Sequence, residues 1–307
     1  MQVVQQQIIQ NRSQSGECRR LFHGRGQTFA GYEDLVIDSY PPVVVVTLYR
    51  QRDQDWLSDL YRLLQAELPG LQAIFLQNRY LLGSPGQVVF GTLPDEIDAC
   101  ESGLRYRLRL DHAQNIGFFP DMAVGRGYVR ERAAGKTVLN LFAYTCAFSV
   151  AALSGGAKHV VNLDMNRNAL NTGRLNHRLN GIDLRRASFE AVEFFRSVGR
   201  LKRLGPFDLI ICDPPATQGK SFTAERHWSK LIRKLPDLLV PGGEVLACLN
   251  APHLPARFIE DLFDEAGGFH PLEGILPGPF FPEINSDSGV TMRTYRWQGG
   301  KGDEVRA

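Results

Sequence analysis

The chain has 307 residues, of which 43% are hydrophobic, and its formal net charge at pH 7 is +2. This length allows one or two domains with a sizeable core, and so small a net charge does not by itself indicate a nucleic-acid-binding protein. The longest apolar runs are too short to span a membrane, and we find no signal-peptide pattern at the N-terminus. The five cysteines are scattered without a C-x-x-C pair, which predicts reduced thiols, a cytoplasmic protein and no metal site.

The first third of the chain predicts a small domain. Residues 1–16 are rich in glutamine, and we expect a flexible lead-in there. Residues 17–110 should form a small α+β domain, and residues 111–307 a larger α/β domain. The expected elements of the small domain are strands at 35–38, 43–48 and 73–76 and a helix whose apolar residues recur at i, i+4, i+7 and i+8, namely Trp56, Leu60, Leu63 and Leu64.

Another strand is predicted where apolar residues alternate with arginines over residues 104–110. One face would carry leucine and tyrosine, and the other would carry Arg105, Arg107 and Arg109. Such a basic face is most often simply solvated, but it is also a candidate contact for RNA phosphates.

Residues 138–164 predict a strand, a turn, a helix and a second strand that ends on an acid. The apolar runs are 138–142 and 160–163, and Asp164 follows the second run. A carboxylate at that position can accept hydrogen bonds from both hydroxyls of a ribose. The turn has no glycine between Phe142 and Ser149, which disfavours a pyrophosphate and therefore NAD or FAD. A cofactor without phosphates, such as S-adenosylmethionine (SAM), is more compatible with it.

From this unit onward, predicted helices and strands alternate. Helices are expected at 166–180, 191–198, 228–239 and 256–266, with Pro236 kinking or splitting the third, and strands at 184–187, 207–212, 245–249 and 290–297. This alternation predicts an α/β fold with a mostly parallel, Rossmann-like sheet covered by helices on both faces. Since ligands bind at the carboxyl ends of such strands, residues 142–146, Asp164 and residues 213–215 should converge there.

The second informative motif is D-P-P at Asp213, Pro214 and Pro215, directly after the apolar strand 207–212. Neither proline has an N–H donor, so the backbone just beyond the carboxylate is stiff and its carbonyls can face a substrate. A carboxylate beside rigid carbonyls suits a planar ring that bears an amino group. The alternative interpretation is a stiff turn after a buried strand.

Together these motifs resemble the class I SAM-dependent methyltransferases. The resemblance rests on NLFAYT at 140–145, Asp164, FDLIICDPP at 207–215 and NIGFFPD at 115–121. It is closest to the branch that modifies bases of bacterial large-subunit ribosomal RNA, which includes cytosine-C5 and guanine-N7 enzymes. The resemblance extends over residues 18–297, because the opening segment is similar to the small domain that precedes the catalytic domain in this branch.

The resemblance implies a role for each residue of the site. Phe142, Ala143 and Thr145 would line the methionine end of SAM, and Asp164 would hold the ribose. Met165 would cover the adenine, and Ser188 or Glu190 would read the amino group of the adenine. Phe119 and Asp121 would also line the cofactor, whereas Asp213, Pro214 and Pro215 would border the target base.

Two departures from the family pattern affect the predicted mechanism. Cys146 stands where these enzymes usually carry glycine, next to the methionine end of the cofactor. Asn250 stands where the cytosine-C5 members carry their nucleophilic cysteine, without which cytosine C5 is not reactive. Guanine N7 already has a lone pair, and the guanine-N7 members resemble this chain more closely at Asn250. We therefore expect direct methyl transfer without a covalent cysteine adduct, with Asn250 orienting the base.

The sequence leaves two other functions open. One is a methyltransferase that acts on a protein side chain or a small molecule, and the other is a SAM- or RNA-binding module with a decayed site. Clustered arginines and the basic run from Lys220 to Lys234 favour RNA as the partner. The basic run predicts a substrate-facing rim, with a solvated helix face as the alternative. The sequence does not indicate an oligomeric state.

Overall fold

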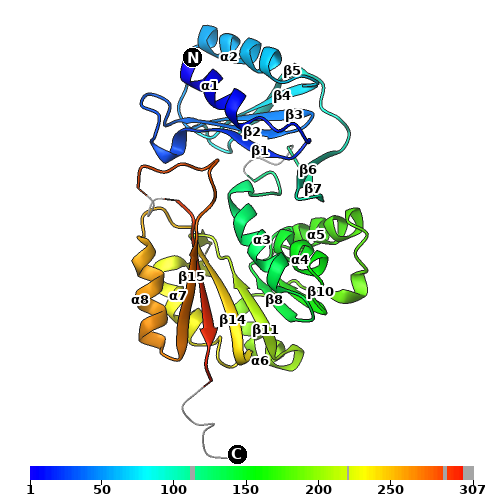
Figure 1. Cartoon of the computed structure of the whole chain (residues 1–307), viewed down its shortest axis with the longest axis vertical. Coiled ribbons are helices and arrows are strands. Elements are labelled where there is room, and N and C mark those ends of the chain that lie inside the picture. Colours follow the sequence, from blue (N-terminus) through cyan, green and yellow to red (C-terminus); the bar gives the residue numbers. More distant parts are fainter. Residues whose placement is uncertain (111–114, 220, 286–288, 300–307) are drawn as a thin grey trace, which may run out of the picture. The chain divides into compact units, whose positions relative to one another are not determined.

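The computed structural model describes the chain except for residues 111–114, 220, 286–288 and 300–307. It divides into two compact units, which Figure 1 shows mainly in blue to cyan and mainly in green to red. The first unit comprises Met1–Asp121 and Gly278–Ser286, and the second comprises Met122–Pro277 and Asp287–Ala307. The first unit therefore includes a segment from late in the chain, which the division at residue 110 did not anticipate. No helix in the described part of the chain is long and apolar enough to cross a membrane.

The first unit contains a five-stranded sheet in the order β1-β2-β3-β4-β5. Its strands are β1 (Arg19–His23), β2 (Leu35–Tyr40), β3 (Val43–Leu48), β4 (Ala73–Asn78) and β5 (Gly86–Gly91). The parallel pair β3 and β4 is joined by helix α2 (Gln54–Glu67), while the other neighbours are antiparallel. Asp53 caps α2 by accepting hydrogen bonds from the amides of Asp55 and Trp56, as expected of an aspartate before the first turn.

The flexible lead-in expected at residues 1–16 is wrong for most of its length, because a helix forms there. Residues Gln2–Asn11 form helix α1, in which Val4 and Ile8 are fully buried. These two residues are four positions apart and share one edge of the helix, which packs into the same apolar cluster as α2 and the sheet. The glutamines that suggested disorder occupy the remaining faces, and Gln5 Nε2 donates to Glu67 Oε1 of α2 at 2.8 Å.

A two-stranded hairpin of β6 (Ile97–Glu101) and β7 (Leu104–Leu108) follows the five-stranded sheet. Two of the arginines on the predicted basic face are neutralised within this hairpin. Asp98 accepts hydrogen bonds from both Arg105 and Arg107 at 2.7 Å, and Arg107 also pairs with Glu96. This arrangement favours a solvated, paired face over the phosphate-binding face that was the alternative.

The second unit is built on a seven-stranded sheet in the order β10-β9-β8-β11-β14-β16-β15. Among the described strands of this sheet, β16 alone runs in the opposite direction to the others. The strands are β8 (Thr137–Leu141), β9 (His159–Leu163), β10 (Ala187–Glu190), β11 (Phe207–Cys212), β14 (Leu239–Leu249), β15 (Phe269–Ile275) and β16 (Thr291–Trp297). The predicted fold class, an α/β Rossmann-like sheet preceded by a small domain, is thereby confirmed.

Helices cover both faces of this sheet, because successive side chains of each strand point to opposite sides. Leu139 and Leu141 of β8 join the core under α6, α7 and α8, whereas Val138 joins the core under α3 and α4. The helices are α3 (Ala123–Arg132), α4 (Ala147–Ser154), α5 (Arg167–Leu179), α6 (Phe194–Leu204), α7 (Ala224–Ile232) and α8 (Ala256–Ala266). Two short strands, β12 (Thr217–Gln218) and β13 (Phe222–Thr223), form a small hairpin after β11.

Several element boundaries differ from the sequence-based prediction, and for two of them the local sequence gives the reason. The strand expected at 184–187 begins only at Ala187, because Leu184–Arg186 form a 3₁₀ turn that Asp183 caps through the Arg185 amide. The helix expected to reach residue 239 ends at Ile232, and Leu239 already belongs to β14. Pro236 lies in the connection, where its missing N–H prevents the helix from continuing.

Candidate active site

The turn between β8 and α4 is held in an uncommon backbone conformation. Phe142, Tyr144 and Cys146 have φ angles of 57°, 47° and 62°, in the left-handed region that residues with a Cβ seldom adopt. Hydrogen bonds hold the turn in place. The Ala143 amide donates to the Leu163 carbonyl at 2.9 Å, the Cys146 amide to the Ala143 carbonyl at 2.7 Å, and the Tyr144 amide to Asp164 Oδ2 at 2.8 Å. The turn is therefore attached to the end of β9, as the sequence motif predicted.

Asp164 occupies the carboxyl end of β9 and is only 6% exposed. Its Oδ2 accepts from Tyr144, and its Oδ1 accepts from the Asn166 amide at 2.7 Å. Burial raises the pKa of this carboxyl group above its ordinary value, while the two amide donors act in the opposite direction. Each oxygen still has a lone pair for a further donor, so the pair of oxygens can accept two ribose hydroxyls.

A buried polar network lies beneath the turn. Asn140 Nδ2 donates to Asn162 Oδ1 at 3.0 Å, and Asn162 Nδ2 donates to Ser149 Oγ at 3.0 Å. The Ser149 hydroxyl lies 2.9 Å from His177 Nε2, and His177 Nδ1 lies 2.7 Å from the Gly173 carbonyl. Because a carbonyl only accepts, Nδ1 must carry the proton, and Nε2 of the neutral ring accepts from Ser149. This network joins β8, β9, α4 and α5, and no local sequence pattern indicates it.

We expect His177 to make the protein less stable in mild acid. Burial lowers the pKa of His177 below its ordinary value, although the bond to Gly173 favours the charged form. The unfolded chain then takes up the proton first, so the free energy of unfolding falls as pH drops below about 6.5. Urea unfolding at pH 7.5 and 5.5 should show a smaller pH-dependent loss in His177→Asn than in the parent. Equal losses in the two proteins would contradict this assignment.

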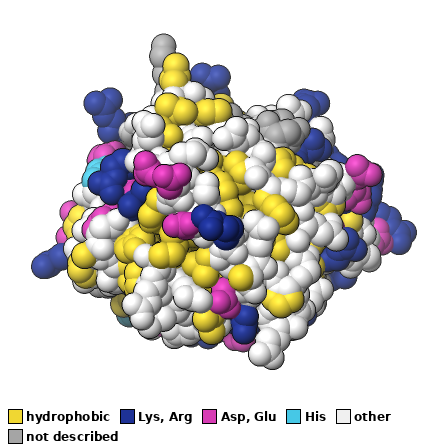
Figure 2. Space-filling view, turned by 90° about the horizontal axis from the view of Figure 1, so that it is seen from above, with side chains coloured by type: hydrophobic (Ala, Val, Ile, Leu, Met, Phe, Trp, Pro, Cys, Tyr) yellow, Lys and Arg dark blue, Asp and Glu magenta, His cyan; other side chains and the backbone are white. Residues whose placement is uncertain are grey.

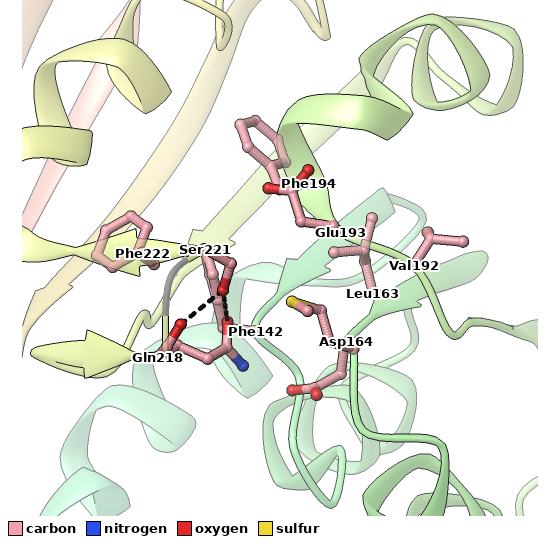
Figure 3. A pocket seen from close by; sticks show the side chains of 10 residues that line it. Phe142, Leu163, Asp164, Val192, Glu193, Phe194, Gln218, Ser221 and Phe222 are labelled. Atoms are coloured by element: carbon pink, nitrogen blue, oxygen red, sulfur yellow. Dashed lines mark hydrogen bonds between the residues drawn. The ribbon is translucent and has the colours of Figure 1, made fainter.

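A pocket at this edge of the sheet brings four separate segments together (Figure 3). The lining consists of Phe142 after β8, of Leu163, Asp164 and Met165 at the end of β9, of Val192, Glu193 and Phe194 where α6 begins, and of Gln218, Ser221 and Phe222. In Figure 3, Phe142 lies beside Gln218 and Ser221. Met165 directly follows the buried Asp164, and its side chain is 47% exposed. Of the two carboxylates in this lining, Glu193 caps α6 by accepting from the Phe195 and Arg196 amides, so Asp164 is the one that can serve a ligand. A carboxylate beside aromatic and aliphatic side chains fits a nucleoside, whose ribose is polar and whose base is flat and apolar on its faces. The residues present therefore fit the adenosine part of SAM.

The D-P-P motif and Asn250 also meet at this edge. Pro215 and Asn250 form a parallel bridge, which places the ends of β11 and β14 side by side. Asn250 is exposed, and Asp213 is partly exposed. The rings of Phe142 and Phe222 are 5.2 Å apart and connect the turn after β8 to the loop that follows the D-P-P motif. Asp213, Pro214, Pro215 and Asn250 thus lie next to the turn that carries Phe142.

The three cysteines of the second unit are buried. An added Cβ at Gly173 would lie 2.4 Å from Cys146 Sγ, so this glycine makes room for the thiol beneath the turn. Burial raises the pKa of Cys146 and of Cys212 well above the ordinary thiol value, and the neighbouring Asp213 adds to the effect at Cys212. Cys248 is fully buried in the apolar core that also contains Leu246.

The remaining predicted site residues differ in where they lie relative to the pocket. Ser188 Oγ is hydrogen-bonded to His159 Nε2 at 2.9 Å. Glu190 is the last residue of β10, and its carboxylate pairs with Arg200 at 2.7 Å. The backbone carbonyl of Glu190 accepts a hydrogen bond from the Asp164 amide. Glu190 therefore lies nearer the pocket than Ser188 along the strand, which supports it as the adenine contact. Phe119 and Asp121 belong to the first unit, so their contact with the cofactor stays a prediction. Lys220, at the start of the predicted basic rim, lies outside the described residues.

The fold of the second unit is that of a methyltransferase with a nucleoside cofactor. It has the strand order given above, β16 is the reversed strand, and a carboxylate stands at the end of β9. The sequence matches the family described as S-adenosylmethionine-dependent methyltransferase over residues 19–296, and the chain belongs to that family. This confirms the predicted family, which is described by its use of SAM as the cofactor.

Individual relatives agree with this assignment. A "Ribosomal RNA large subunit methyltransferase" of Deinococcus radiodurans is 30% identical over 257 residues, covering 79% of this chain and 62% of that protein. "Ribosomal RNA large subunit methyltransferase K/L" of Shewanella amazonensis is 37% identical over 160 residues, which are 50% of this chain and 22% of that protein. The chain thus spans less than two thirds of either relative. Among solved structures, SMU.776 complexed with SAH has a TM-score of 0.83 at 24% identity and covers 92% of this chain and 76% of that one.

Proposed function

We propose that this enzyme methylates a base of large-subunit ribosomal RNA by direct transfer from SAM, without a covalent cysteine adduct. The names of the relatives support RNA as the substrate. The observation that carries the direct route is Asn250, an exposed side chain at the end of β14 where the cytosine-C5 enzymes would have their nucleophile. An amide nitrogen is not nucleophilic, because its lone pair is delocalised into the carbonyl.

In this proposal, the turn and the ends of β9 and β10 hold the cofactor. SAM supplies an electrophilic methyl group on a sulfonium. Asp164 binds the ribose, Met165 covers the adenine, and Phe142 with the fixed turn at Ala143, Thr145 and Cys146 lines the methionine end. Asn176 Nδ2 donates to the Thr145 carbonyl at 2.9 Å and so supports this turn from α5. Glu190 completes the part of the proposed cofactor site that the second unit supplies.

The target base would lie against Asp213, Pro214, Pro215 and Asn250. The two proline nitrogens carry no hydrogen, so this stretch of backbone presents carbonyls without competing donors. The Asn250 amide can both donate and accept, which suits the polar edge of guanine. A ring nitrogen with a free lone pair can attack the methyl group in line, and holding the two reactants in this geometry supplies most of the rate.

Methylation of ribosomal RNA from cells that lack the gene tests the proposal. Incubation of that RNA with the purified protein and isotopically labelled SAM should introduce one labelled methyl group at a base, identified by mass spectrometry of the digested nucleosides. RNA from cells that carry the gene should accept much less label. Labelling of protein or of small molecules in the same extract, with none in RNA, would identify the other class of substrate. SAM binding without transfer to any of these would indicate the decayed module.

A further inference from the structure

Two neighbouring helices of the second unit carry a matched pattern of basic residues. On α6 these are Arg196, Arg200 and Arg203, and just after the pocket loop they are Arg226, Lys230 and Arg233 on and following α7. Both sets are spaced i, i+4 and i+7, so each forms one ridge along a helix, about 10 Å long. All six side chains are exposed. We call these sets the α6 ridge and the α7 ridge.

The two ridges run side by side and start at the active site. Near the beginning of the helices, the rings of Phe195 and His227 are 5.8 Å apart. Near the end of α6, Lys202 Nζ lies 2.9 Å from Asp237, which belongs to the connection between α7 and β14. Glu193 and Phe194, where α6 begins, line the pocket, as does Phe222, just before α7. Both helices therefore lead away from the pocket in the same direction, on the same face of the sheet.

These charges are largely uncompensated. Arg200 pairs with Glu190, but across the described residues no carboxylate forms an ion pair with the other five members of the ridges. The third helix of the same layer, α8, differs in sign: it exposes Asp261, Asp264 and Glu265, and its Arg257 pairs with Asp261. The layer is thus basic on α6 and α7 and acidic on α8. An ordinary solvated helix face would mix both signs, as the face in Figure 2 does, where Lys and Arg lie among hydrophobic and acidic side chains.

We propose that the α6 and α7 ridges bind the phosphate backbone of the RNA that flanks the target nucleotide and guide it to Asp213 and Asn250. This inference rests on the proposed function and adds to it the path of the substrate over the enzyme. Parallel rows of cations that end at the pocket suit a polyanion, whose phosphates repeat along the chain and require no side-chain specificity. The acidic surface of α8 repels the same polyanion and limits the path to the other two helices.

Salt-dependent RNA binding tests this path. The variant Arg203→Gln/Arg233→Gln removes one charge from each ridge at the end far from the pocket. If each arginine neutralises one phosphate, the slope of log affinity against log salt should flatten by about 1.4 to 1.8. Between 50 and 200 mM KCl, the parent should then lose roughly ten-fold more affinity for a large-subunit ribosomal RNA fragment than the variant does. Fluorescence anisotropy measures both proteins.

A matched control removes the same net charge elsewhere. Lys158 and Arg185 are exposed and lie just before β9 and β10, at the opposite edge of the sheet. Lys158→Gln/Arg185→Gln should keep the slope of the parent, and both variants should keep its SAM affinity in calorimetry. An equal change in the control would show that only overall charge matters and would overturn the proposed path.

Three further outcomes are decisive. A parent that methylates ribosomal RNA and a ridge variant with an unchanged slope would refute the ridges alone. A parent that neither binds nor methylates RNA would refute the proposed function, and the ridges with it. A ridge variant that loses binding to phosphatidylserine vesicles but keeps the RNA slope would assign these charges to a membrane surface and also overturn the inference.

Discussion

Replacing Asp164 by alanine is expected to weaken SAM binding by at least about 100-fold. The variant loses two hydrogen bonds from ribose hydroxyls to a charged acceptor, each contributing roughly 1.5–3 kcal/mol. The loss is large because this carboxylate is buried, and the two amides that hold it have already fixed both oxygens in place. Isothermal titration calorimetry with SAM measures the affinity directly.

The chain offers a closely matched control at the opposite edge of the same sheet. Asp208 lies at the beginning of β11, and its Oδ2 accepts the Thr137 amide at 2.8 Å, much as Asp164 accepts the Tyr144 amide. Asp208→Ala removes a carboxylate that supports the backbone but lies at the amino end of the strands. It should lower the free energy of unfolding without changing SAM affinity. Unchanged SAM affinity in Asp164→Ala, or an equal loss in both variants, would show that the cofactor is wrongly placed.

The central strands of the second unit could be predicted because each is an apolar run that ends in a polar or turn-forming residue. β11 was predicted to the residue, since Pro206 precedes it and Asp213 follows it. Helix α1 could not be predicted in this way. It has only a narrow apolar edge, and its glutamines resemble a disordered segment until Val4 and Ile8 find a surface to pack against. The formation of α1 therefore depends on tertiary contacts rather than on the local sequence pattern.

The same distinction applies to the candidate site. Asp164, the D-P-P motif and Asn250 follow strands whose carboxyl ends must share one edge of a parallel sheet, so the sequence indicated their proximity. The network from Asn140 to His177 could not be foreseen, because its members come from four elements and each is an ordinary polar residue in the sequence. The pairing of Arg105 and Arg107 with Asp98 likewise appears only when the hairpin register is known.

Asn250→Ala is expected to lower kcat/KM for RNA methylation by about 10- to 100-fold, without changing SAM affinity, because the variant loses a group that orients the base. Replacing Cys146, Cys212 or Cys248 by alanine, one at a time, should leave transfer largely intact. All three thiols are buried, and burial disfavours the thiolate that attack on a base requires. The methylation rate with labelled SAM is measured separately for Asn250→Ala and for each of the three cysteine variants.

A trapping experiment separates this mechanism from the covalent one. An RNA substrate that contains 5-fluorocytosine holds an enzyme that attacks cytosine C6 in a stable adduct, because the fluorine at C5 cannot leave as a proton does. We expect the parent protein to form no such adduct, since Asn250 occupies the exposed end of β14 next to Pro215. An adduct that survives denaturing electrophoresis, and that one of the three cysteine replacements abolishes, would refute direct transfer and identify that cysteine as the nucleophile of a cytosine-C5 enzyme.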